Sequence, residues 1–394
     1  MSSRLGYLLA VLIPITMVGH AGVVETDHAT VPPIRVRNML DTLLHPIDPG
    51  TLKAHLEEAP SPVEFDMFAG DNSTLERLNP PKGGALAVAS GYSVEVDAGE
   101  VFAPAPADGS RNIYMGAVKS TDALALRVQV RLDGLGDSDE LWCVDPDHPR
   151  AFGPYRREDD DPDGVWLPTI EGDTVALMLR TADDSLPKLE ITALSHFFRP
   201  LRQAVTAKSL LPCHVNVACI EDETVQSIST GVGYIVTTGI GSDSFICTGT
   251  LINTPQTEEF EPFFITANHC VGSQREARQV DVIWDFRAPN CDSNAAPSLS
   301  SLPRSRGAQM LHSSSSLDIS LLELNNVPPG SRGRTYVGYT TRTPSVGEDV
   351  LTLHHPRSSH MRATTGYVEA INVFSFPWQG QTRARWEEGV TEAG

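Results

Sequence analysis

The stretch Phe263-Phe264-Ile265-Thr266-Ala267-Asn268-His269-Cys270 decides the fold of this chain. Its apolar residues predict a buried strand, and the polar residues after them predict a turn that presents His269. A second motif lies upstream, Cys247-Thr248-Gly249-Thr250-Leu251-Ile252. A disulfide between Cys247 and Cys270 would tie the turn to the preceding strand and fix the approach of the imidazole ring. The alternative is a histidine that merely neighbours an unrelated structural disulfide.

A histidine held in this way can act as a general base. Hydrolysis of a peptide bond by a serine hydroxyl needs an imidazole to take the hydroxyl proton and a buried carboxylate to orient the ring. His269 fits the first role, and Asp318, directly before the apolar run Ile319 to Leu324, fits the second. Asp281 and Asp285 compete for the second role, although they flank what reads as an ordinary strand and its turn. The order of histidine and then aspartate along the chain favours Asp318.

Composition bounds the class of protein. The chain has 394 residues, which is comfortable for two domains, and its 40% hydrophobic and 20% charged residues are ordinary for globular protein. The formal net charge of -20 argues against nucleic acid or an anionic membrane as a partner. The 6 cysteines are expected to be mostly paired if the chain is secreted, and none has the Cys-x-x-Cys spacing of a zinc or redox site.

The N-terminus predicts secretion. Arg4 supplies a positive charge, Leu8 to Val18 is almost wholly apolar, and Gly19-His20-Ala21 offers small residues around a cleavage point. The apolar run is too short to span a bilayer comfortably, so a signal peptide over residues 1–21 is favoured over a membrane anchor. No later stretch of the sequence is apolar enough to span a membrane, and we expect a soluble extracellular chain after signal removal.

The rest of the pattern predicts an all-β fold. Ile34 to Leu44 could carry a short helix, stopped by His45-Pro46. From about residue 83 to Phe198, short apolar runs broken by turn residues predict an antiparallel sandwich. Residues 200–208 read as a linker, and further short strands then predict a barrel. The expected strands are Ala123 to Leu132 (with Leu124, Leu126, Val128 and Val130 on one face), Val175 to Leu179, Leu189 to Ile191, Gly231 to Thr238, Thr248 to Ile252, Val280 to Trp284, Ile319 to Leu324 and Asp349 to His354.

Several motifs between Cys213 and Gly394 belong together. They are Cys213-His214-Val215-Asn216-Val217-Ala218-Cys219, Cys247-Thr248-Gly249-Thr250, Thr266-Ala267-Asn268-His269-Cys270, the run from Asp318 to Asn325, His354-His355-Pro356, and Gly389-Val390-Thr391-Glu392. In this order they resemble the trypsin-like serine proteases, and specifically the bacterial lysyl endopeptidase branch. The resemblance covers nearly half of the chain, and the motifs together are highly specific.

The resemblance implies a chymotrypsin-like double β-barrel over residues 209–394, incomplete at its C-terminal end. The disulfides that it implies are Cys247–Cys270 and Cys219–Cys291. Cys213 should pair with a cysteine past the last residue, whereas Cys143 has no assigned partner. In the family, the lead-in of residues 389–392 continues into a Gly-Ser-Ser-Gly-Ser-like element whose second serine attacks the substrate. Gly394 would be its first glycine, whose backbone N–H helps to form the oxyanion hole, so the nucleophile is expected after this chain.

The region before residue 209 resembles, more loosely, the β-rich prosegment of such proteases, in Gly153-Pro154-Tyr155, Trp166 and Gly172-Asp173-Thr174-Val175. Residues 22–208 are therefore predicted to be a prosegment, which can keep a protease inactive until it is cut away. Lys208-Ser209 is the expected junction, because a lysine-specific enzyme could cut it by itself. Cleavage after lysine is implied only by the resemblance.

Two other patterns suggest metal sites and are discounted. The acidic run Glu158 to Gly164 invites a calcium interpretation, but Ile170 stands where an EF-hand loop counted from Asp159 needs glutamate, which favours a solvated acidic loop. His354 and His355 have no further ligand at a recognisable spacing and are interpreted as strand and loop residues. Ser313 to Ser316 is interpreted as a polar loop.

Two functions remain as hypotheses. The first is a secreted serine endopeptidase precursor that hydrolyses polypeptides through an acyl-enzyme and needs no metal or cofactor. We expect polypeptide substrates as its partners, no nucleic acid, no membrane after signal removal, and a monomer. The second is a non-catalytic secreted protease homologue that acts as a binding module, because a chain that ended at Gly394 could not perform covalent serine catalysis. An open second barrel would expose strand edges, so we expect the literal 394-residue product to aggregate or be degraded.

Overall fold

The computed structural model describes residues 30–36, 47–66, 84–202, 215–255, 260–293, 295–375 and 378–386. The predicted signal peptide, the junction at Lys208-Ser209, Cys213 and Gly394 lie outside the described residues. The division of the chain into a prosegment and a protease domain at residue 208 therefore stays a prediction.

The N-terminal part forms a β-sandwich. One sheet has the order β3-β6-β12-β8-β9 with β5 beside β6, and the facing strands are β10, β11, β7, β13 and β4. Apolar side chains of both layers meet in one core, which includes Val128 and Leu194 on one side and Val118 and Leu177 on the other. The strands are β3 (Val63–Phe65), β4 (Leu86–Asp97), β5 (Phe102–Asp108), β6 (Arg111–Ser120), β7 (Ala125–Arg131), β8 (Glu140–Asp145), β9 (Arg150–Tyr155), β10 (Val165–Trp166), β11 (Ile170–Glu171), β12 (Thr174–Thr181) and β13 (Glu190–Phe197).

The next strands form a curled sheet, the first barrel of the C-terminal part. Its hydrogen-bonded order is β20-β21-β17-β16-β15-β18-β19. The core includes Phe264 and Trp284, whose rings meet edge to face with centroids 5.8 Å apart. The strands are β15 (Val232–Thr238), β16 (Ser244–Leu251), β17 (Phe263–Thr266), β18 (Asp281–Ile283), β19 (Arg304–Arg306), β20 (Ala308–Ser314) and β21 (Ile319–Leu324).

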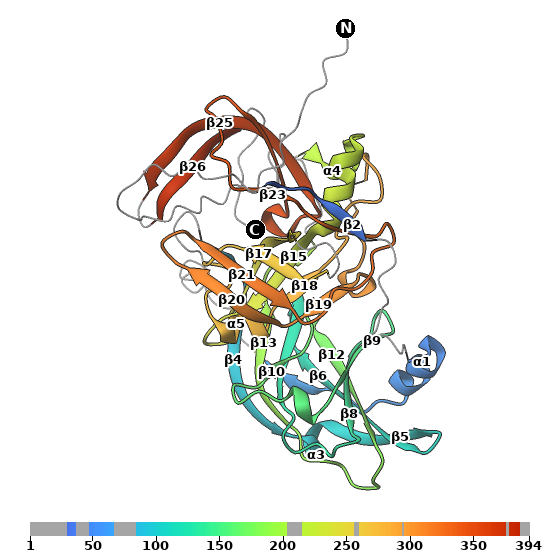
Figure 1. Ribbon diagram of the computed structural model, residues 1–394. Helices are drawn as coiled ribbons and strands as arrows, with labels where there is room; N and C mark the ends of the chain where they lie inside the picture. Colours follow the sequence, from blue (N-terminus) through green and yellow to red (C-terminus); the bar gives the residue numbers. More distant parts are fainter. Residues whose placement is uncertain are drawn as a thin grey trace.

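The sandwich and the first barrel share one continuous 12-stranded sheet, because β4 pairs with β16. Figure 1 shows this arrangement: the cyan and green strands of the sandwich lie against the yellow and orange strands of the barrel. A third sheet contains β14 (Val215–Asn216), β24 (Asp349–His354), β25 (Arg362–Ser375) and β26 (Trp378–Trp386), and corresponds to the second barrel. Two small ladders join β1 (Thr30–Val31) to β23 (Tyr339–Thr340) and β2 (Ile34–Val36) to β22 (Arg334–Tyr336).

Helices are short and peripheral. Asp48 accepts a hydrogen bond from the Thr51 N–H, and Pro49 occupies the first turn, which together start α1. The α-helices are α1 (Pro49–Glu57), α3 (Ala98–Val101), α4 (Glu223–Ile228) and α5 (Gln274–Arg278). The short 3-10 segments are η1 (Arg157–Asp159), η2 (Val217–Cys219), η3 (Ser229–Gly231), η4 (Leu299–Ser301) and η5 (Pro356–Ser358). Within the described ranges, no helix has the length and apolar character that crossing a membrane requires.

The predicted fold class is confirmed: the protein is all-β, with a sandwich-like part followed by chymotrypsin-like barrel strands. The predicted strands at Ile319–Leu324 and Asp349–His354 have those same bounds. The helix predicted from Ile34 is wrong at its start, because residues 34–36 form strand β2 and pair with β22 in a non-local contact that the local pattern does not carry. Leu124 is 47% exposed and precedes β7, so it does not share the buried face of Leu126.

Candidate active site

The turn that carries His269 follows β17 directly. Ala267 accepts backbone hydrogen bonds from Cys270 and Val271, which closes the turn. The hydroxyl of Thr266 donates to the carbonyl oxygen of Thr248 at 3.0 Å, which ties the end of β17 to β16. The apolar run and the polar residues after it therefore form the predicted strand and turn, and the turn is tight.

A disulfide joins Cys270 to Cys247 with their Cα atoms 6.1 Å apart. This is the pairing that the family resemblance implies. Both cysteines are buried in the core of the first barrel. The disulfide thus attaches the residue after His269 to β16 and fixes the turn from its C-terminal side.

Asp318 reaches His269 from the turn between β20 and β21. Its Oδ2 lies 2.7 Å from Nδ1 of His269, and its Oδ1 accepts the backbone N–H of His269 at 3.0 Å. The two oxygens of one carboxylate therefore fix both the ring and the backbone of the histidine. Asp318 has φ 54°, a left-handed conformation that aspartate tolerates better than most residues. The side chains of His269 and Asp318 are 28% and 15% exposed, respectively.

Sheet register brings these residues together. β17 pairs with β21 so that Thr266 lies opposite Ser320, which places the turns on either side at the same end of the sheet. The Ser320 hydroxyl donates to the carbonyl of Val271 at 2.6 Å, and the Asn268 amide donates to the Ser313 hydroxyl at 2.6 Å. Ser313 belongs to β20, so the interpretation of residues 313–316 as a plain polar loop is wrong in part. These serines carry no motif, and only the pairing of β20 with β21 reveals their role.

The geometry suits a general base. Since Nδ1 faces the carboxylate, Nε2 is the nitrogen that would take a proton from a neighbouring hydroxyl, and Asp318 would stabilise the imidazolium that forms. Partial exposure of the imidazole leaves it within reach of a substrate, whereas the more covered carboxylate keeps its orienting contact.

The competing carboxylates hold arginines instead. Oδ2 of Asp281 lies 2.7 Å from Nη1 of Arg304, a pair whose side chains are 1% and 2% exposed. Asp285 contacts Arg334 at 3.1 Å. The two aspartates are therefore not ordinary strand and turn residues: each neutralises a buried guanidinium, a role that local sequence gives no sign of.

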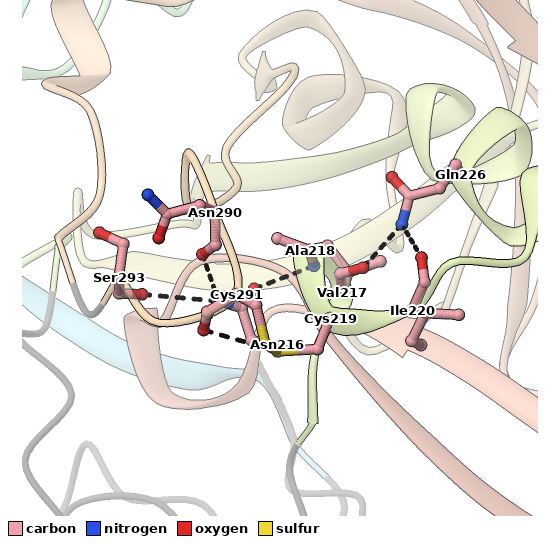
Figure 2. The surroundings of a disulfide bond; sticks show 9 residues. All are labelled: Asn216, Val217, Ala218, Cys219, Ile220, Gln226, Asn290, Cys291 and Ser293. Atoms are coloured by element: carbon pink, nitrogen blue, oxygen red, sulfur yellow. Dashed lines mark hydrogen bonds between the residues drawn. A yellow bond between two sulfur atoms is a disulfide. The ribbon is translucent and has the colours of Figure 1, made fainter.

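Among the described residues, the other cysteines are one disulfide pair and one free thiol. Cys219 is joined to Cys291, as the resemblance implies, and Figure 2 shows the surroundings of this disulfide. There the amide of Asn216 donates to the carbonyl oxygens of Asn290 and Cys291, both at 3.1 Å. Cys143 is a free cysteine buried in the sandwich core, and burial raises the pKa of its thiol to about 12.

The acidic run from Glu158 to Gly164 and the histidines His354 and His355 make contacts with other protein groups. The acidic loop is not simply solvated, because Asp160 contacts Arg131 at 3.3 Å and Asp161 contacts Arg278 of α5 at 2.5 Å. His354 and His355 bond Thr364 and the carbonyl of Ser359. The side chains of Cys247, His269 and Cys270 lie within 4.8 Å of one another, but the two sulfurs are joined in the disulfide and do not fit a thiolate metal site.

The curled β-sheet, the disulfide beside the histidine and the facing aspartate are the features of a trypsin-like serine protease domain. Comparison of the sequence with known families supports this class: residues 209–394 match the family described as lysyl endopeptidase, C-terminal domain. A lysyl endopeptidase from Pseudomonas aeruginosa is 29% identical over 244 residues, which cover 58% of this chain and 51% of that protein. The predicted resemblance to trypsin-like serine proteases is therefore confirmed for residues 209–394. The chain spans about half the length of the curated relative that it matches.

Two solved structures have partial similarity to this chain. A variant of the HtrA-type protease AlgW with a tripeptide is 16% identical with a TM-score of 0.29, over 43% of this chain and 46% of that one. The MamO protease domain from Magnetospirillum magneticum is 13% identical with a TM-score of 0.27, over 42% of this chain and 75% of that one.

Proposed function

We propose that this protein is a secreted serine endopeptidase that hydrolyses polypeptides through an acyl-enzyme. The observation that carries the proposal is the double contact of Asp318 with the ring and the backbone of His269. A carboxylate that holds an imidazole in this way prepares it to take a proton from an alcohol. Similarity of residues 209–394 to the lysyl endopeptidase C-terminal domain supports the same reaction.

In the proposed mechanism, Nε2 of His269 takes the proton of a serine hydroxyl as the serine oxygen attacks the scissile carbonyl carbon. Asp318 stabilises the imidazolium, which then gives the proton to the leaving amine. Water repeats the sequence on the acyl-enzyme and releases the acid. We propose that the serine follows Gly394 in a longer product of the gene, and that the Gly394 backbone N–H helps to bind the oxyanion. On this proposal the 394-residue chain alone is inactive.

We also propose cleavage after lysine, secretion and a removable prosegment. Lysine preference is supported by the similarity to the Pseudomonas lysyl endopeptidase. Secretion is supported by the N-terminal sequence and by the two disulfides, which persist in oxidising compartments. Residues 22–208 are the proposed prosegment, cut at Lys208-Ser209 by the enzyme itself. N-terminal sequencing of a mature secreted form would show Ser209 as the first residue, and another start would remove this junction from the proposal.

The proposed function is tested on a product that extends past Gly394 into the expected serine. Peptide substrates that differ only at the residue before the scissile bond should be hydrolysed when that residue is lysine. His269→Gln should abolish this hydrolysis, whereas His148→Gln, on an exposed side chain of the sandwich, should leave it intact. Binding of polypeptides without hydrolysis by the extended product would instead support the non-catalytic binding module.

A further inference from the structure

The strand edge beside the catalytic turn is occupied by the chain's own N-terminal part. On one side β16 pairs with β15 from Ser244 to Thr250. On the other side β17 covers only Thr250 and Leu251. The remaining end of that edge, Ser244 to Ile246, is covered by residues 86–89 of β4. Within the described residues, nothing from the C-terminal part pairs with this end of the edge.

β4 and β17 lie in line along this edge, with the catalytic turn between them. Both run antiparallel to β16, so β17 ends at Thr266 next to the turn, and β4 begins at Leu86 on its other side. The disulfide Cys247–Cys270 joins the uncovered middle of β16 to the turn, and Ala85 packs in the same apolar cluster as both cysteines. The start of β4 is therefore adjacent to the residues that position His269.

An extended polypeptide recognises an unpaired strand edge through backbone hydrogen bonds, with little demand on its side chains. The covering segment Leu86-Ala87-Val88-Ala89 has apolar side chains and makes this kind of pairing. An endopeptidase must hold its substrate extended on both sides of the scissile bond. The edge next to the catalytic turn has the chemistry and the place to hold one of those sides.

We propose that β4 and an extended polypeptide substrate compete for the edge Ser244–Ile246, so that the N-terminal part blocks one half of the substrate path. This inference deepens the proposed endopeptidase function and rests on it. β4 occupies the backbone positions on this edge that the substrate would use, and this exclusion requires no contact with the imidazole of His269. Displacement of β4 would open the path without any change in the His269–Asp318 pair.

The contacts at the turn between β15 and β16 hold β4 in place. Asp243 accepts the backbone N–H of Gly91 at 2.9 Å. A Cβ added at Gly91 would lie 2.2 Å from the carbonyl oxygen of Gly241 and 2.3 Å from a backbone carbon of Ser242, so any side chain there forces the strands apart. By contrast, a Cβ added at Gly99, in α3 of the same N-terminal part, would meet nothing within 4 Å. Gly91→Ala and Gly99→Ala are therefore a matched pair of variants.

The test uses the product extended past Gly394 and carrying His269→Gln, so that the probe is bound but not hydrolysed. The probe is a fluorescein-labelled α-lactalbumin that has been reduced and carboxymethylated and so is an unfolded polypeptide. Gly91→Ala should raise hydrogen exchange at residues 244–246 about tenfold and tighten probe binding by a similar factor, whereas Gly99→Ala should match the wild type. An unlabelled peptide of residues 84–93 should displace the probe.

A second variant, Asp243→Ala, releases the same strand without a steric clash and should change both measurements in the same direction. Faster exchange at residues 244–246 with unchanged probe affinity in either variant would overturn the inference. Exchange that stays at the wild-type rate in both variants would also overturn it, because β4 would then not be displaceable. Absence of hydrolysis by the extended product would remove the proposed function alone, since probe binding does not depend on it.

Discussion

Two contacts between an aspartate and a basic side chain have equal length but differ in what surrounds them. His269 Nδ1 and Asp318 Oδ2 are 2.7 Å apart, as are Arg304 Nη1 and Asp281 Oδ2. The first pair is 28% and 15% exposed, whereas the second is 2% and 1% exposed, beneath the sandwich. Thr169 of the sandwich donates its N–H to Asp281 and accepts a hydrogen bond from Arg304. One carboxylate therefore orients a partly exposed imidazole at the candidate active site, whereas the other helps to dock two parts of the chain.

The largest expected effect is the loss of hydrolysis when the contact between His269 and Asp318 is removed. Asp318→Asn in the extended product should lower kcat by about 10⁴-fold, because the amide cannot stabilise the imidazolium or select the tautomer. Steady-state hydrolysis of a lysyl peptide measures this. Asp349→Asn, on an exposed side chain, is the matched control. Hydrolysis that survives Asp318→Asn within tenfold would exclude Asp318 as the partner of the base.

A change to the buried pair of Asp281 and Arg304 should lower the stability of the fold. Asp281→Ala leaves Arg304 charged, buried and without its partner, which should lower the free energy of unfolding by about 3–5 kcal/mol. Urea denaturation of the extended product measures the change. Asp133→Ala removes a carboxylate that is 66% exposed and should cost less than about 1 kcal/mol. Equal losses for the two variants would show that burial does not separate these pairs.

Removal of the two disulfides separates stability from activity. Cys247→Ser with Cys270→Ser opens a loop with a sequence separation of 23 and should cost about 3 kcal/mol. Cys219→Ser with Cys291→Ser opens a loop with a sequence separation of 72 and should lower the free energy of unfolding by at least as much. Only the first double variant should slow hydrolysis by the extended product at temperatures where both variants are folded. Equal slowing by both would contradict the role assigned to the Cys247–Cys270 disulfide.

The smallest effect is a slope of stability with pH. Burial lowers the pKa of His355 to about 3, and that of His360 to about 4. An unfolded histidine takes a proton near pH 6.5, so below this pH the unfolded chain binds more protons than the folded one. Stability should therefore be full above about pH 6.5 and fall towards pH 3, by about 1.4 kcal/mol per pH unit for His355.

His355→Phe tests the slope, because the ring at position 355 already stacks on Phe286 with centroids 5.5 Å apart. Urea midpoints at pH 7 and pH 5 should differ less in this variant than in the wild type. An unchanged difference would assign the slope to other groups.

The pairing of His269 with Asp318 could be predicted from the sequence, whereas the pairing of Asp281 with Arg304 could not. His269 stands in a motif of a few residues, and Asp318 precedes an apolar strand that has its predicted bounds. Both signals are local, and the chain order links them. The pairing of Asp281 with Arg304 also spans few residues, but its meaning depends on Thr169 and the sandwich, which are brought there by tertiary packing.

The pairing of β4 with β16 shows the same limit. Ala89 and Ser244 lie opposite each other although they are far apart in the sequence, and neither strand has a pattern that names its partner. The strand at Ile34–Val36 illustrates the reverse error, since a local helix pattern gave way to pairing with Tyr336 and its neighbours. Local motifs therefore predicted which residues meet at the candidate site, whereas contacts between the N-terminal and C-terminal parts had to come from the structure.

The central claim is that the imidazole of His269 activates a serine. It is tested most directly by the rate at which diisopropyl fluorophosphate labels the extended product, with and without His269→Gln. We predict rapid labelling of one serine in the wild type and a loss of about 10⁴-fold or more in the variant. Equal labelling rates in the two proteins would contradict the account.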